Sequence, residues 1–166
     1  MSVLTFSNLP DTARIWIYGA ERPLTSEQIR ALNNHMEAFL MEWQSHGREV
    51  TPSWQLLHDR FVVIGVDEAA VHLSGCSIDS MARSLGGFNR ASGLNFSNSG
   101  GEVFYRDTAG KIDCVDRSAF RDMVKQGTVN EQTVVFNNTV TTVGEFRAGR
   151  WEVPMRNSWH SQVFSH

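Results

Sequence analysis

Residues 61–66 constrain the fold of this chain more than any other segment, because they form an apolar run that fills both faces of a β-strand. A strand of this kind lies in the centre of its sheet. Residues 54–57 precede it and are expected to pair with it. Residues 14–18, with apolar side chains on both faces, predict another short buried strand. The first part of the chain therefore predicts a sheet.

Two helices are expected beside these strands. Residues 25–28 have the form of a capping box, and apolar residues recur at helical spacing from there until Gly47, which predicts a helix over residues 26–46. A second, shorter helix is predicted over residues 77–85, ended by Gly86 and Gly87. Strands and helices in this order favour an α+β fold, in which a small mixed or antiparallel sheet is covered by the two helices.

The second half of the chain predicts a smaller β-rich part. Gly, Ser and Asn dominate residues 87–101, which are expected to form a loop. A hairpin over 102–106 and 111–115, a helix between Asp116 and Gly127, and a second hairpin around a type I′ turn at Asn137 and Asn138 follow. We therefore divide the chain into a core (1–86), the loop (87–101) and a hairpin-helix-hairpin subdomain with an irregular aromatic tail (102–166), packed as one domain.

Composition narrows the class of protein. The 166 residues carry a formal net charge of −3, so there is no basic field of the kind that draws a protein onto nucleic acid or an anionic membrane. No apolar run reaches the length of a membrane span, and residues 1–9 lack a secretion signal, so a cytoplasmic location is expected. The two cysteines, Cys76 and Cys114, are expected to be free thiols. Arg predominates over Lys. Because the Arg guanidinium suits bidentate contacts to carboxylate or phosphate, the composition is compatible with a pocket that binds an anion.

The segment Ser74–Asp79 is the candidate site. It follows the acidic pair Asp67 and Glu68 and opens the predicted second helix, where free backbone N–H groups and the helix dipole stabilise a thiolate at Cys76. For catalysis Cys76 is the candidate nucleophile, His46 or His160 the base, and Asp67 or Asp79 the group that orients it. For ligand binding the candidates are Ser74, Gly75, Ser77, Asp67 and Glu68.

Each of these residues also has a structural interpretation. Cys76 is a small apolar residue that can pack at a helix start, and Asp79 can cap the helix. His46 ends the long helix, where an imidazole interacts well with the dipole. His160 follows Trp159, which can anchor the tail by itself. A zinc site built from His72, Cys76 and either Cys114 or another histidine lacks the paired spacing of zinc motifs, so no metal and no cofactor is predicted.

Seven short motifs together resemble a family of small bacterial proteins. They are Arg14-x-Trp16-Ile17-Tyr18, Trp43-x-x-His46-Gly47, Val66-Asp67-Glu68, Ser74-Gly75-Cys76-Ser77-Ile78-Asp79, Val135-Phe136-Asn137-Asn138, Trp151-Glu152-Val153-Pro154 and Ser158-Trp159-His160. The resemblance spans nearly the whole chain and implies no established activity. The stretch from residue 86 departs from the family, in which ordinary helical sequence is usual.

Members of that family often carry the label of an ABC transporter ATPase, and the residues argue against this chemistry here. A P-loop needs Gly-x-x-x-x-Gly-Lys followed by Ser or Thr, so that backbone amides surround the phosphates and the hydroxyl reaches magnesium. Around the Gly110-Lys111 pair, Tyr105 stands at the place of the first Gly and Ile112 at that of the hydroxyl residue. ATP hydrolysis by a P-loop is therefore excluded.

The sequence favours a cytoplasmic binding or interaction module that holds a small anion or a peptide at residues 74–79 through helix N–H groups. The alternative is a thiol-dependent enzyme that uses Cys76 on an acyl or electrophilic substrate. A third hypothesis makes the motif a device for helix initiation and packing. With five Trp and ten Phe, the chain also has the apolar surface for a homodimer.

Overall fold

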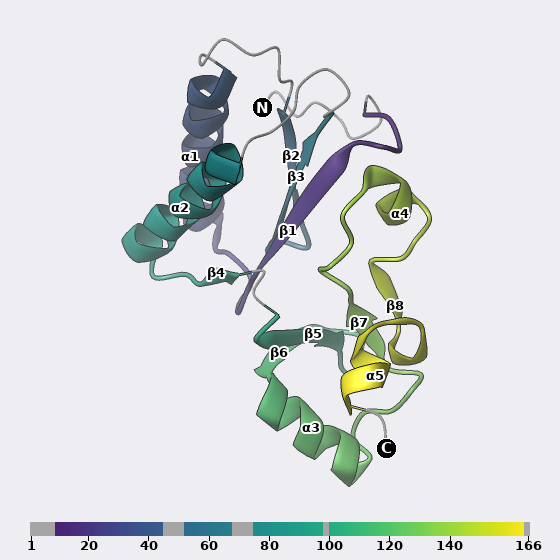
Figure 1. Cartoon of the computed structure of the whole chain (residues 1–166). Coiled ribbons are helices and arrows are strands. Elements are labelled where there is room, and N and C mark those ends of the chain that lie inside the picture. Colours follow the sequence, from purple (N-terminus) through teal and green to yellow (C-terminus); the bar gives the residue numbers. More distant parts are fainter. Residues whose placement is uncertain (1–8, 45–51, 68–74, 98–99, 165–166) are drawn as a thin grey trace.

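The chain folds as α+β, with two antiparallel sheets of four strands each (Figure 1). The structure is a computed structural model that describes residues 9–44, 52–67, 75–97 and 100–164, and for residues 43–44, 52 and 75–79 the backbone alone. The first sheet has the order β2 (Pro52–Leu57), β3 (Phe61–Val66), β1 (Arg14–Ala20) and β4 (Phe96–Ser97). The second has the order β6 (Ile112–Asp116), β5 (Glu102–Arg106), β7 (Val134–Phe136) and β8 (Glu152–Pro154).

The helices cover the outer faces of the two sheets. Helices α1 (Ser26–Gln44) and α2 (Gly75–Ser92) pack on the first sheet, and α3 (Arg117–Gln126) and α5 (His160–Phe164) pack on the second. Figure 1 shows α1 and α2 along one side of the first sheet, with α3 and α5 at the far end of the molecule. The short helix α4 (Val143–Arg147) and a 3₁₀ turn (Met155–Asn157) lie in the connections.

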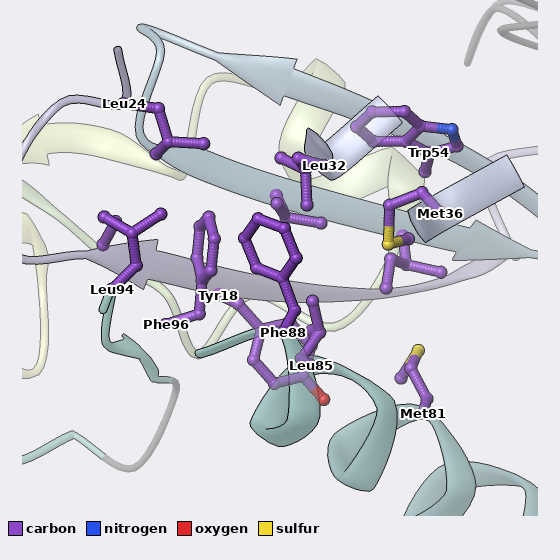
Figure 2. Close-up of a cluster of buried hydrophobic side chains, with 13 residues drawn as sticks. Tyr18, Leu24, Leu32, Met36, Trp54, Met81, Leu85, Phe88, Leu94 and Phe96 are labelled. Atoms are coloured by element: carbon purple, nitrogen blue, oxygen red, sulfur yellow. The ribbon is translucent and has the colours of Figure 1, made fainter. Parts of the chain in front are cut away.

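Strand β3 lies between β2 and β1, and all six of its residues are buried, so the prediction of a central strand is confirmed. Its side chains alternate between two clusters, as those of a strand must. Val62 and Ile64 join the cluster beneath α1 and α2. Figure 2 shows this cluster, in which side chains of both helices pack together with those of the first sheet. Phe61 and Val63 point the other way, into the cluster between the two sheets.

Helix α2 is longer than predicted. It begins at Gly75 instead of residue 77, continues through Gly86 and Gly87, and ends at Ser92, before the left-handed Gly93 (φ 72°). Leu85 and Phe88, on either side of the two glycines, are both buried in the first cluster. Burial of a large apolar side chain contributes about 1.5–3 kcal/mol, which outweighs a cost of about 1 kcal/mol for each glycine within a helix.

The prediction of a loop over residues 87–101 is therefore wrong in two places. Its first six residues belong to α2, so the boundary expected at residue 86 falls inside a helix. Farther on, Phe96 and Ser97 form β4, which pairs with Gly19 and Ala20 of β1. The segment contributes to the core because Leu94 and Phe96 are buried in the same cluster as Phe88.

The first predicted hairpin and the following helix are confirmed. Strands β5 and β6 are joined through a turn that contains Gly110 in the left-handed region (φ 81°). Asp116 caps the start of α3 by accepting a hydrogen bond from the Ala119 N–H, and Gly127 (φ 76°) ends it. Local capping chemistry determines both ends of this helix.

The second predicted hairpin is wrong. Among the described non-glycine residues, His58 and Asp59 have positive φ, whereas Asn137 and Asn138 do not form the type I′ turn. The Asn137 N–H donates instead to the Trp151 carbonyl oxygen (2.6 Å), and the Trp151 indole N–H donates to Asn138 Oδ1 (2.8 Å). Strand β7 consequently pairs with β5 and β8, and the chain leaves it toward α4. The aromatic tail, expected to be irregular, contains β8, the 3₁₀ turn and α5.

The two sheets are joined through the buried side chain of Arg60, which is 3% exposed. Its guanidinium donates to the carbonyl oxygens of Ala20 (3.2 Å) and Glu21 at the end of β1, and to that of Ile112 (2.8 Å) in the second sheet. Beside it the sheets approach closely at Gly19, where a Cβ atom would lie 2.4 Å from Phe104 Cζ. The Arg60 guanidinium thus provides hydrogen-bond donors for three backbone carbonyl oxygens at the junction.

We expect Arg60→Met to lower the free energy of unfolding by about 3 kcal/mol, because hydrogen bonds from a charged donor contribute roughly 1.5–3 kcal/mol and the three acceptors would lose their partner. Urea unfolding followed by tryptophan fluorescence measures the change. The matched control is Arg30→Met, at an exposed position on α1. Equal stability of the two variants would show that the junction does not depend on Arg60.

Candidate functional site

The start of α2 carries the predicted thiol site. Helix α2 begins at Gly75, so the backbone of Cys76 and Ser77 lies in its first turn, as a helix-start site requires. The side chains of Cys76, Ser77 and Asp79 lie outside the described residues, as do Ser74, Glu68 and His46 altogether. Asp67 is half-buried directly after β3. The arrangement of these groups around the thiol therefore stays a prediction.

His160 is not brought to this site. It is the first residue of α5, is 1% exposed, and packs between Trp159 (ring centroids 3.9 Å apart), Phe120 and Phe164. These residues cover the outer face of the second sheet, whereas α2 covers the outer face of the first. Figure 1 shows α5 and the start of α2 well apart, with strands of both sheets between them.

The environment of His160 also determines its protonation. Its Nδ1 lies 2.7 Å from the hydroxyl oxygen of Ser158, which is itself buried. Burial of the ring, assisted by the positive charge of Arg117, lowers the pKa of His160 to about 4. The imidazole is consequently neutral at pH 7, and this pKa lies well below the range that suits a general base at neutral pH.

Cys114 has the opposite character from the reactive thiol expected at Cys76. It lies on β6 facing the cluster between the sheets, and it is a free thiol, as predicted. Burial raises the pKa of the Cys114 thiol to about 12, although the charge of Arg60 acts in the other direction. Cys114 is therefore a protonated, structural thiol at physiological pH.

A groove that the sequence analysis missed lies on the second sheet. Strands β5 and β7 pair at Tyr105 and Val135. Beyond this pair the two strands diverge on either side of a groove of about 450 Å³. The lining residues come from the end of β5 and its turn, from α3, and from the segment that leads into β7. They are Tyr105, Arg106, Asp107, Thr108, Gly110, Met123, Thr128, Val129, Asn130, Gln132, Thr133 and Val134.

The floor and rim of this groove differ in chemistry. Tyr105 and Val129 are buried and Met123 and Val134 half-buried, which makes the floor apolar. Neutral polar side chains, among them Asn130 and Gln132, form most of the rim. No short motif could have revealed the groove, because its residues come from three segments that only the pairing of β5 with β7 brings together.

The charged groups at one end of the groove neutralise each other. The Arg106 guanidinium donates two hydrogen bonds to the Glu152 carboxylate (2.9 and 3.1 Å) and one to the Gly110 carbonyl oxygen (2.7 Å). The hydrogen bonds to Glu152 raise the pKa of Arg106, so its charge is permanent. His58 Nε2 lies 3.9 Å from Glu152, with the imidazole stacked on Trp151.

Other classes of site find no support in the described residues. Within residues 9–42, 53–67, 80–97 and 100–164, no group of three His, Cys, Asp or Glu side chains could hold a metal ion. No described helix is both long and apolar enough to cross a membrane.

Compared with known proteins, the chain matches no family model, no curated protein and no solved structure. Functional inference therefore depends on the geometry and chemistry of the chain itself.

The neutral state of His160 predicts a pH dependence of stability. Between pH 6.5 and pH 4 the unfolded chain binds a proton at this residue and the folded chain does not, so stability falls as the pH falls through this window. The lowered pKa corresponds to about 3 kcal/mol. Chemical unfolding of wild type and His160→Gln at a series of pH values measures the contribution. We expect the wild type to lose about 3 kcal/mol more than the variant, and parallel profiles would contradict the assignment.

Proposed function

We propose that this protein is a binding module that holds a short, extended peptide segment of a partner protein in the groove between β5 and β7. The observation that carries the proposal is the combination of an apolar floor with a neutral polar rim in an open groove of about 450 Å³. An apolar floor accommodates alternate side chains of an extended peptide, and amide and hydroxyl groups on the rim can bind its backbone.

The charges of the groove favour a peptide over a small anion. Arg106 is the cation of the lining, and its charge is already paired with Glu152. Asp107, the carboxylate of the lining, accepts hydrogen bonds from the backbone N–H groups of Ala109 and Lys111 through Oδ1. An anion would have to compete with Glu152 for Arg106 and would meet the charge of Asp107.

We also propose a cytoplasmic location, which the free thiol of Cys114 supports, since unpaired cysteines persist in reducing compartments. A homodimer remains an expectation. Among the described residues the large exposed hydrophobic side chains are Met41 and Val163, which lie singly on α1 and α5. Isolated apolar residues of this kind are ordinary surface features.

Filling the groove should abolish peptide binding. Thr128 lines the groove with an exposed side chain, so Thr128→Trp places an indole where the ligand is expected. Thr12→Trp, at an exposed position outside the groove, is the matched control. Peptides enriched from a random displayed library on the full chain should bind wild type and Thr12→Trp with equal affinity and bind Thr128→Trp at least tenfold more weakly.

Two results would contradict the proposal. One is failure to enrich any peptide sequence on the wild-type protein. The other is enrichment of peptides that bind Thr128→Trp as tightly as they bind the control, because their site must then lie elsewhere, for example at residues 74–79.

The second candidate function is a thiol-dependent enzyme that uses Cys76 as the nucleophile. The observation that favours it is the position of Cys76 in the first turn of an 18-residue helix, where the dipole and free N–H groups lower the pKa of a thiol. His46 remains the candidate base, and Asp67 or Asp79 the candidate orienting group. Because His160 lies on the outer face of the second sheet and α2 on that of the first, His160 is no longer a candidate base for Cys76.

The pH dependence of alkylation separates the two functions. Cys114 is the internal control and should react slowly up to about pH 10, because its thiol ionises only near pH 12. An enzyme requires Cys76 to react with a midpoint well below the ordinary thiol value of about 8.5. Peptide mass spectrometry after timed alkylation measures both residues in the native chain. A Cys76 midpoint at or above that value would exclude catalysis by this thiol.

A further inference from the structure

A second, smaller cavity lies at the opposite end of β5 from the peptide groove. It has a volume of about 30 Å³, room for one or two waters or for one small polar group. Phe104 and Phe136 contribute apolar walls, and Glu102, Asn138, Trp159 and His160 contribute polar groups. Two of the sequence motifs, Phe136-Asn137-Asn138 and Ser158-Trp159-His160, meet here although they lie far apart in the chain.

The indole N–H of Trp159 is the first unexplained group at this cavity. Its Nε1 atom is buried and has no hydrogen-bond partner. Buried donors in folded proteins are nearly always satisfied, because an unmade hydrogen bond costs stability. Trp151 provides the comparison, since its indole N–H donates to Asn138 Oδ1 at 2.8 Å. The Trp159 donor is therefore open to an acceptor from outside the chain, either a water or an atom of a ligand.

His160 and Asn138 supply further donors. His160 Nδ1 lies 2.7 Å from the Ser158 hydroxyl oxygen, and when that hydroxyl donates, the proton of the neutral imidazole is on Nε2. Asn138 uses its carbonyl oxygen for Trp151, which leaves its N–H₂ group for a ligand. The lining side chains of Trp159 and Asn138 thus offer N–H donors, and His160 offers a third in the tautomer that carries its proton on Nε2.

Two charged side chains lie near the cavity, the Glu102 carboxylate and the Arg117 guanidinium. Glu102 lines the cavity with a half-buried carboxylate, which is a hydrogen-bond acceptor. Arg117 lies outside, with its guanidinium 4.9 Å from the Trp159 ring centroid and its Nε donating to the Gly100 carbonyl oxygen. A negatively charged ligand would meet the Glu102 carboxylate at close range in a poorly hydrated space, so the ligand should be neutral.

We propose that this cavity is a binding site for a small molecule that carries a primary carboxamide. The carbonyl oxygen of that group accepts hydrogen bonds from the N–H donors of Trp159 and His160, and its N–H₂ group donates to the Glu102 carboxylate. No charge is buried without a partner. The site is separate from the peptide groove, so either can exist without the other.

The probe is acetamide, added to the full-length ¹⁵N-labelled protein. The five tryptophan indoles give separate signals, assigned by triple-resonance spectroscopy. We expect the Trp159 indole signal to shift with a saturable dependence on acetamide while the Trp151 signal stays in place. Acetate, which is charged, and N,N-dimethylacetamide, which has no N–H, should bind at least tenfold more weakly.

Glu102→Gln is the discriminating variant, because it removes the charge and keeps the size of the side chain. It should raise the affinity for acetate at least fivefold, whereas Glu131→Gln, an exposed position outside the cavity, should leave it unchanged. Three results would overturn the proposal. They are a Trp159 signal that does not saturate, an equal shift of all five indole signals, and acetate bound by the wild type as tightly as acetamide.

Discussion

The fold depends on a single buried cation at the place where the two sheets meet. Arg60 is the last residue of the tight turn between β2 and β3, and its guanidinium donates to backbone carbonyls at the end of β1 and on β6. A guanidinium suits this task because its donors are planar and divergent and because its charge persists when it is desolvated. Phe104 can then pack against Gly19, and the cluster between the sheets becomes continuous.

Local patterns in the sequence predicted the elements whose ends depend on local chemistry. The both-sided apolar run of β3, the capping box of α1 and the Asp116 and Gly127 caps of α3 all correspond to observed features. Prediction failed where tertiary contacts overruled local preference. Burial of Phe88 carries α2 past Gly86 and Gly87, and the hydrogen bonds of Trp151 hold Asn137 and Asn138 in a turn after β7 that lacks the positive φ of a type I′ turn and does not close a hairpin.

The candidate sites also differ in whether a single segment of the sequence contains them. The helix start at Cys76 was visible because one short segment contains it, and α2 does begin there. The groove between β5 and β7 and the small cavity could not be found from the sequence, because each combines segments that sheet pairing brings together. Several residues of the resembling motifs have structural roles: Trp151 is a core residue, Glu152 pairs with Arg106, and Ser158 fixes the orientation of His160. Motif residues that support the architecture and motif residues that bind ligands cannot be separated by sequence alone.

The single register pair between β5 and β7 has a consequence for motion. The second sheet consists of two ribbons, β5 with β6 and β7 with β8, and Tyr105 and Val135 provide the pairing that joins them. Separating β5 from β7 costs less free energy than unfolding either pair of strands, because few backbone hydrogen bonds join β5 to β7. The width of the groove can therefore change by a small rotation of β7 and β8 against β5 and β6, while Arg60 keeps β6 fixed to the first sheet.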